Sequence, residues 1–254
     1  MQRAIFLVLI ALVARNVLAQ GDSFDMPLDK KVVDLGPSPA NLPGVLRVRI
    51  ELWCFVYRDL MVKQFDEGEK GAAWLAIVPI RAGLKPVCSK VYSPGERVIN
   101  PKEWSGYFKG VKKNLVFFDA ADGDNGGMPF VIYDSGTGKR IFEDSYYEAR
   151  MWNQKVEDSP FNELRVNYTP DGRVLLIYLR VIGTACDLNR DAASCWEPLR
   201  KRLGVTNLKA PICTGYTDIR DRWSSAVAFP VEVSPFPRPT KKNIDGPVKC
   251  WPVD

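Results

Sequence analysis

The acidic, glycine-rich stretch at residues 119–127 has the composition of a calcium-binding loop. Carboxylate and amide oxygens on a sharply bending backbone are the ligands that calcium prefers in proteins. The candidate ligands are Asp119, Asp122, Asp124 and Asn125. Their spacing departs from the D-x-D-x-D-G pattern, and the alternative is a polar turn, in which Asp, Asn and Gly are favoured for their conformations. Calcium stays one interpretation of this loop, and no other cofactor is indicated.

Aromatic side chains recur along the strand predicted at residues 46–57. Trp53, Phe55 and Tyr57 occupy alternate positions, and alternate side chains of a strand point to the same face. Such a row, about 13–14 Å long at normal strand rise, can stack on sugar rings. The alternative is that the rings pack against a neighbouring strand, loop or helix. Trp104 and Tyr107, in a glycine-flanked segment, form a second candidate ligand-binding pair.

Histidine is absent from the sequence. This excludes Ser-His-Asp and Cys-His nucleophile pairs, histidine general bases and histidine-ligated metal sites. Any catalysis would have to use other groups, such as the two carboxylates that lie ~5–9 Å apart in glycoside hydrolases. Glu51, Asp134, Glu143 and Asp144 are candidates for such a pair. Nothing in the sequence selects two of them, so no catalytic residue is assigned.

The first nineteen residues have the layout of a secretory signal peptide. Arg3 precedes a short apolar run, and a small-residue cleavage site ends at Ala19, before Gln20. The run is too short to span a bilayer, so we expect a secreted or periplasmic protein with no membrane span after cleavage. Removing Arg3 and Arg15 from the 35 basic residues leaves 33 against 30 acidic ones. This well-mixed charge predicts no nucleic-acid partner.

Six cysteines follow the predicted signal peptide, and an even number in an oxidising compartment predicts disulfides. Cys186 and Cys195 are separated by only eight residues, which makes them the favoured pair. For the other four we prefer the two local pairings, Cys54 with Cys88 and Cys213 with Cys250. Because no C-x-x-C pair is present, a thiolate zinc site is not expected.

Alternating apolar and polar residues predict strands along most of the chain. The clearest is at residues 46–57, and the others are expected at 73–81, 115–119, 130–134, 139–143, 164–168, 173–182 and 225–233. Turn residues at 135–138 and 169–172 predict hairpins. A capping box from Ser194 to Glu197 predicts one short helix, with Pro198 in its first turn and Gly204 as its end.

These elements predict a mainly β fold, either an antiparallel sandwich or an irregular barrel, with one or two short helices and stabilising disulfides. The hairpin from Tyr133 to Lys139 resembles the outer-strand hairpins of β-propeller blades, which makes a propeller-like fold the alternative. The predicted strands are too few for a closed ring of five blades, which needs about twenty. We expect a signal peptide at 1–19, an extended N-terminal arm at 20–44 and a single mainly-β domain at 45–254, with a proline-rich tail at 234–254.

Three functions fit this composition. The favoured one is a non-catalytic secreted or periplasmic β domain that binds a protein or an envelope or glycan component. The second is a histidine-free glycan hydrolase that uses carboxylates, and the third is a calcium-stabilised structural module. A cleft with two facing carboxylates beside Trp53 or Trp104 would favour the hydrolase, whereas a filled sandwich would favour the binding protein.

Overall fold

The computed structural model describes residues 24–38, 48–81, 86–148, 161, 163–215 and 224–253. The predicted signal peptide and its cleavage site lie outside these residues. The elements, in chain order, are β1 (Asp29–Pro37), β2 (Arg49–Val56), β3 (Leu60–Asp66), β4 (Trp74–Pro79), β5 (Arg97–Ile99), β6 (Gly106–Lys112), β7 (Leu115–Ala120), β8 (Met128–Asp134), β9 (Lys139–Tyr146), β10 (Arg165–Tyr168), β11 (Val174–Gly183), α1 (Leu188–Leu203), β12 (Ser224–Ser234), β13 (Thr240–Asn243) and β14 (Lys249–Val253).

The strands pair antiparallel in chain order for much of the fold. The first sheet has the order β1-β2-β3-β4-β5. The remaining strands form one hydrogen-bonded sheet, but β9 and β11 are joined through a single residue pair, Tyr146 with Arg180. This junction separates a middle sheet, the β6–β9 meander, from a last sheet built on β11 and β12, with β10, β13 and β14 at its margins.

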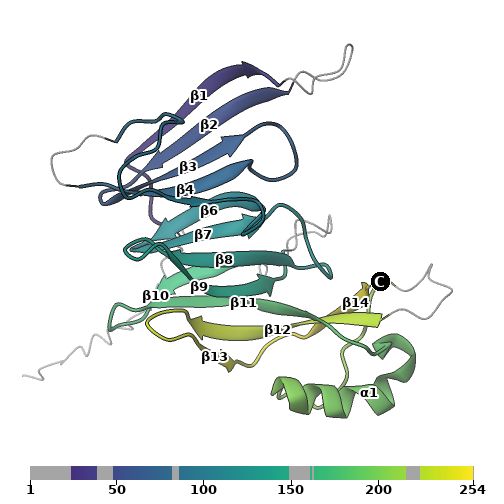
Figure 1. Cartoon of the computed structure of the whole chain (residues 1–254). Coiled ribbons are helices and arrows are strands. Elements are labelled where there is room, and N and C mark those ends of the chain that lie inside the picture. The colour runs from purple at the N-terminus through teal and green to yellow at the C-terminus, as the bar shows by residue number, and fades with distance from the viewer. Residues whose placement is uncertain are drawn as a thin grey trace, which may run out of the picture.

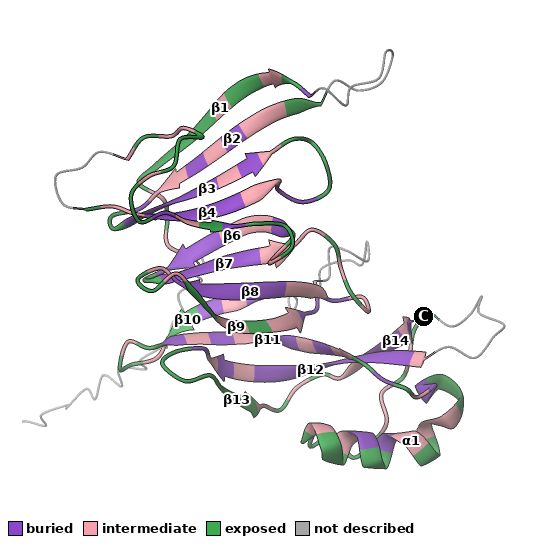
Figure 2. Ribbon diagram, viewed as in Figure 1, coloured by how far each residue is buried: buried purple, intermediate pink, exposed green. Residues whose placement is uncertain are grey.

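The middle sheet is buried on both faces, because alternate residues of its strands enter two different cores. Val116 and Phe118 of β7 pack with the first sheet in the first core. Leu115 and Phe117 of the same strand pack with β11, β12 and α1 in the second core. The three sheets therefore follow one another as layers, with the first sheet uppermost in the view of Figure 1 and α1 beside the last sheet. In Figure 2 the central strands are mostly buried, whereas β1 is largely exposed.

The mainly-β antiparallel fold and its disulfides are confirmed. The sheets are stacked in the manner of a sandwich and are not closed into a barrel, which corrects the barrel alternative. Face-to-face stacking also occurs between propeller blades, but the described residues supply three sheets, fewer than the smallest ring of about four blades. No helix in the described part of the chain is long and apolar enough to cross a membrane.

Several boundaries differ from the sequence-based expectations. Strand β1 lies within the expected N-terminal arm, and β13 and β14 follow the strand expected to be the last. The sequence pattern also missed β3, because Lys63 interrupts its apolar run. The Lys63 side chain is fully buried, and its Nζ lies 2.9 Å from Glu96 Oε2. Lysine side chains are usually exposed, and a buried lysine needs a charged partner. Because the partner of Lys63 is distant in sequence, the local pattern does not indicate that this lysine lies in a buried strand.

The single described helix begins before the predicted capping box. Its N-cap is Asp187, whose carboxylate accepts hydrogen bonds from the backbone N–H groups of Asn189 (3.1 Å) and Arg190 (3.2 Å). These bonds satisfy N–H groups that would otherwise have no partner in the first turn. A distortion at Asp191, with φ of −114°, separates this turn from the remaining helix. Gly204, with φ of +68°, ends α1 as predicted.

Candidate functional site

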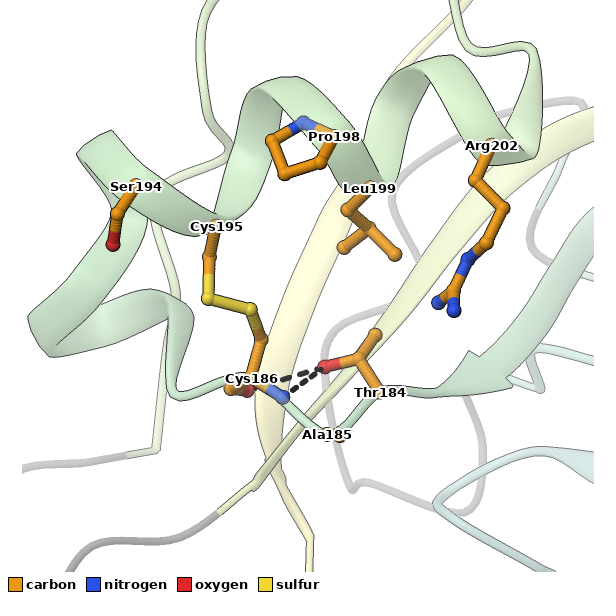
Figure 3. Close-up of a pocket in the computed structure, with 8 residues that line it drawn as sticks. All are labelled: Thr184, Ala185, Cys186, Ser194, Cys195, Pro198, Leu199 and Arg202. Carbon is orange, nitrogen blue, oxygen red and sulfur yellow. Dashed lines mark hydrogen bonds between the residues drawn. A yellow bond between two sulfur atoms is a disulfide. The ribbon is translucent and has the colours of Figure 1, made fainter.

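The structure contains the three predicted disulfides, Cys54–Cys88, Cys186–Cys195 and Cys213–Cys250. The Cys186–Cys195 bridge joins the residue before the N-cap of α1 to the body of the helix. It lines an open pocket of about 290 Å³, together with Thr184, Pro198 and Leu199. Figure 3 shows the disulfide and the guanidinium of Arg202 on either side of Leu199. The pocket is small and open, and the described residues place no carboxylate in its lining.

The candidate calcium ligands are not brought together. Asp119 lies 2.6 Å from Lys109 Nζ, and Asp122 pairs with Lys70. The Asp124 carboxylate accepts a hydrogen bond from the Asn125 amide at 3.1 Å. The backbone of Asp124 pairs with that of Gly127, and Asn125 has a φ of +49°, as in a tight turn. Within the described ranges, no group of three or more Asp, Glu, Cys or His side chains is placed to hold a metal ion.

The aromatic row that starts on β2 leads into the first core at its Tyr57 end. Trp53 and Phe55 are half-buried and Tyr57 is buried. The rings of Trp53 and Phe55 lie 6.4 Å apart, and Phe55 lies 4.5 Å from Phe108 of β6. The Nζ atom of Lys30 lies 4.6 Å from the centre of the Trp53 ring. Phe55 and Tyr57 therefore serve the packing of one sheet on another, whereas Trp53 is not among the described residues that form or pack against the first core.

The side chains of Trp104 and Tyr107 form hydrogen bonds with the backbone of neighbouring segments. The Trp104 indole N–H donates to the carbonyl of Asp119 at 3.3 Å, and the Tyr107 hydroxyl accepts from the backbone N–H of Gly71 at 2.8 Å. Between them stands Gly106, where an added Cβ would lie 1.9 Å from the Asp119 carbonyl oxygen. The glycine is required by this close approach of β6 to β7. Both aromatic side chains are half-buried.

A polar network that the sequence did not indicate surrounds Asp119. The Lys109 ammonium lies 2.6 Å from Asp119 Oδ2 and 2.6 Å from the Tyr146 hydroxyl. That hydroxyl also lies 3.1 Å from Asp119 Oδ2 and 3.3 Å from Glu148 Oε2. The other carboxylate oxygen of Asp119 is buried and has no hydrogen-bond partner among the described residues. Two carboxylates, a phenol and an ammonium thus meet at the edge of the second core.

Burial controls the electrostatics of this network. Desolvation raises the pKa of Asp119, although the charge of Lys109 and the hydrogen bonds from Lys109 and Tyr146 oppose it. Desolvation, reinforced by the charges of Asp119 and Glu148, raises the pKa of Tyr146 well above its usual range. The phenol therefore keeps its proton and bridges the two carboxylates. The Tyr146 hydroxyl lies between the two carboxylates, 3.1 Å from Asp119 Oδ2 and 3.3 Å from Glu148 Oε2.

A second network of hydrogen bonds and ion pairs lies at the junction between the middle and last sheets. The Arg180 Nε lies 2.8 Å from both carboxylate oxygens of Asp144, and the Tyr178 hydroxyl donates to Asp144 at 2.8 Å. Lys241 of β13 lies 3.6 Å from the same carboxylate. Burial lowers the pKa of Lys241, and Asp144 counteracts this by stabilising the ammonium. Asp144 therefore links β9, β11 and β13.

The remaining candidate carboxylates also have local partners. Glu51 accepts from the Trp53 indole at 3.0 Å, and Glu143 pairs with Arg140 at 3.1 Å. Asp134 accepts from the Asn114 amide at 2.7 Å and from the Thr137 backbone N–H at 2.7 Å, which stabilises the turn of the β8–β9 hairpin.

Two further hollows lie elsewhere on the surface. A cleft of about 570 Å³ lies between the segment before β1, the β2–β3 turn and the β6–β7 turn, and Asp25, Tyr57 and Lys113 contribute to its lining. A hollow of about 350 Å³ is lined by residues that include Tyr147 and Trp251. Both aromatic side chains are already buried, so they act mainly as core groups.

Exposed apolar side chains gather on the segment that contains β1. They are Met26 (73% exposed), Leu28 (75%), Val32 (45%) and Leu35 (42%). Strand β1 is the terminal strand of the first sheet, so its outer edge has no partner among the described strands. The sequence pattern missed this feature because residues 20–44 carry turn-forming prolines and few alternating residues.

Comparisons with known protein families, curated proteins and solved structures found no match to this chain.

Proposed function

We propose that this chain is an exported, non-catalytic β protein that binds a protein partner through the outer edge of its first sheet. The observation that carries the proposal is the concentration of exposed apolar side chains along and just before β1. A free sheet edge offers backbone N–H and C=O groups to an incoming strand, and exposed apolar side chains beside it add buried area on contact.

The state of the acidic side chains supports binding over catalysis. A carboxylate-dependent hydrolase needs an acid and a second carboxylate across an open scissile bond. Asp119 and Glu148 are the best-placed pair, but Tyr146 bridges them and Lys109 neutralises Asp119. Binding of a glycan is supported less than binding of a protein, because Lys30 covers Trp53 and the other rings of the row lie deeper. Calcium is likewise supported less, since lysines already balance Asp119 and Asp122.

Export is supported by the signal-like leader and by the three disulfides, which persist in oxidising compartments. If the leader is cleaved as proposed, the intact mass of the secreted or periplasmic protein will match that of a chain that begins at Gln20. A mature product that retains residues 1–19 would contradict this part of the proposal.

Site-specific photo-crosslinking tests the binding surface. A photoreactive residue is placed at Leu28 or Leu35 in the full-length exported protein, and matched controls carry it at exposed Lys139 or Lys201. The proposal expects protein adducts from the first two positions and few from the controls. Equal yields at all four positions, or none at Leu28 and Leu35, would contradict it.

A further inference from the structure

The outer edge of β1 is regular over the residues that a partner strand would use. Asp29 to Asp34 pair in unbroken register with Val56 to Glu51 of β2, and the register shifts only between Asp34 and Pro37. Residues 30, 32 and 34 share the face of Phe55, Trp53 and Glu51, since paired residues point to the same side of a sheet. Figure 1 shows β1 as the outermost strand of its sheet, and Figure 2 shows most of its surface exposed.

We propose that this edge pairs with the β1 edge of a second copy of the chain, antiparallel about a twofold axis at Val32. The two first sheets would then form one continuous sheet across the dimer. This inference rests on the proposed function, because it names the partner that occupies the surface proposed there.

The charges of β1 are self-complementary in this arrangement. A twofold axis that relates antiparallel strands within one sheet stands perpendicular to that sheet and leaves each side chain on its own face. The residues that face each other are therefore equally distant from the axis. With Val32 on the axis, Lys30 lies opposite Asp34 of the second copy, and Asp34 lies opposite Lys30 of the second copy. Opposite charges that face each other across strands are stabilising.

Neighbouring registers are less favourable. An axis at Lys30 would place Asp29 opposite Lys31 of the second copy, but it would also set two lysines against each other at the axis. An axis at Lys31 would likewise oppose two lysines, and an axis at Asp34 would oppose two aspartates. An axis at Val33 would place Val32 opposite Asp34 and Lys31 opposite Leu35, with no charge pair. Like charges directly opposite each other are destabilising. The Val32 register is thus the one that the side chains of the strand favour.

The same register improves the surroundings of Asp34 and Val32. Within one copy Asp34 lies opposite Glu51, and Arg49 balances the two acids by pairing with Asp34. Lys30 of the second copy would add a further cation at this point. Val32 lies beside Trp53 on the same face. Two Val32 side chains would pack against each other between the two Trp53 rings, each with Lys30 over its face, and the contact would cover a side chain that is 45% exposed in the single chain.

The contact would involve a short stretch of β1 in each copy, which is small against the ~1,200–2,000 Å² of a stable interface. We therefore expect a weak dimer whose population rises with protein concentration. Analytical ultracentrifugation of the mature full chain over a wide concentration range measures this equilibrium. Lys30→Asp and Asp34→Lys should each weaken the dimer by about tenfold, since each creates two like-charge pairs.

The double variant Lys30→Asp with Asp34→Lys restores opposite charges and should recover most of the association. Lys31→Asp is the matched control, because it makes the same charge change at a position that faces Val33 of the second copy. Val32→Lys provides an independent test, since it places two cations at the axis and replaces a side chain that is 45% exposed.

A monomer at every concentration would overturn the inference, as would a dimer that is insensitive to Lys30→Asp and Val32→Lys, or a double variant that stays monomeric. Photo-crosslinks from Leu28 to a different protein, with no dimer, would overturn the self-pairing and leave the proposed function standing. The absence of both dimer and crosslinks would remove both.

Discussion

Asp119 and Asp144 are each held by a cation and a tyrosine hydroxyl from other strands. Lys109 and Tyr146 hold Asp119, whereas Arg180 and Tyr178 hold Asp144. Burying a carboxylate is costly unless it is paired and hydrogen-bonded. Each network therefore favours one arrangement of the strands that supply its members, because any other arrangement would leave a buried charge without partners.

Removing the cation beside Asp119 tests this role. We expect Lys109→Met to lower the free energy of unfolding by about 1–3 kcal/mol at neutral pH, since a partly buried carboxylate loses its strongest partner. The control Lys70→Met removes a cation from the exposed pair with Asp122 and should cost less than about 1 kcal/mol. Urea denaturation measures both, and equal losses would contradict a special role for Lys109.

The pH dependence of this loss follows from the sign of the Asp119 shift. Burial raises the pKa of Asp119, so the stability that the carboxyl contributes is present below its unfolded pKa and is lost as pH rises through the folded pKa. Lys109→Met raises that pKa further. The variant should therefore be closest to the parent protein in acid and should fall behind as pH rises. A difference that shrinks with rising pH would contradict this.

The Tyr57 phenol provides a second prediction about pH dependence. Burial and, to a lesser degree, the charge of Asp25 raise its pKa to about 12. The stability that the neutral phenol contributes is present below pH about 10 and is lost as pH rises through about 12. The ultraviolet titration difference between the parent protein and Tyr57→Phe should have its midpoint near 12 in the folded state. A midpoint near 10 without denaturant would show that the side chain is not buried.

Helix α1 and its disulfide show how an element can differ from its local sequence signal. Ser194 to Glu197 has the pattern of a capping box, but Asp187 caps the helix seven residues earlier. The Cys186–Cys195 bridge holds the intervening residues against the rest of the helix, so the first turn forms despite the distortion at Asp191. The end of α1 was predictable because a glycine with positive φ is a local requirement.

The accessibility of this bridge leads to a prediction. We expect a mild thiol reductant to open Cys186–Cys195 first, because both cysteines are half-buried and line an open pocket, whereas Cys54 and Cys250 are almost wholly buried. Its loss should lower the free energy of unfolding by about 2–3 kcal/mol, as expected for a short closed loop. Timed alkylation with peptide mapping gives the order of opening. Earlier modification of Cys54 or Cys250 would contradict it.

At the scale of the whole molecule, the middle sheet joins two cores. Phe117 and Phe118 are adjacent on β7, are both fully buried and enter different cores. We expect Phe117→Ala and Phe118→Ala each to cost about 3–5 kcal/mol. Each should lower the melting temperature of the whole protein in one transition, because the two cores share β7 and β8. Phe236→Ala, at a residue that is 44% exposed, is the control and should have little effect.

Calorimetry of these variants also tests the expectation that residues 45–254 form a single domain. Two separate transitions, with one variant affecting only the first and the other only the second, would show that the two cores unfold independently. One shifted transition in both variants would support a single cooperative unit.

The antiparallel β class and the pair Cys186–Cys195 could be predicted from the residues alone, whereas Cys54–Cys88 and Cys213–Cys250 were only preferred as local pairings. Strand alternation is a property of each strand's own side chains, and the cysteine pairs chosen were all close along the chain. Strands with weak local signals were missed, and β1 and β3 are the clearest examples. In β1 most side chains are exposed on both faces, and in β3 a buried lysine finds its partner 33 residues away.

How the chemistry-bearing residues meet depends on the packing of the sheets. Asp119 was one candidate among several in a loop, and its partner Tyr146 lies 27 residues away on another strand. Their meeting depends on strand register and on the stacking of the middle sheet against the last, and many residues share the energy of that packing. The same packing places β1 at the end of its sheet, with no further strand beside it among the described residues. A local pattern carries no information about either outcome, because each depends on residues that are distant in sequence.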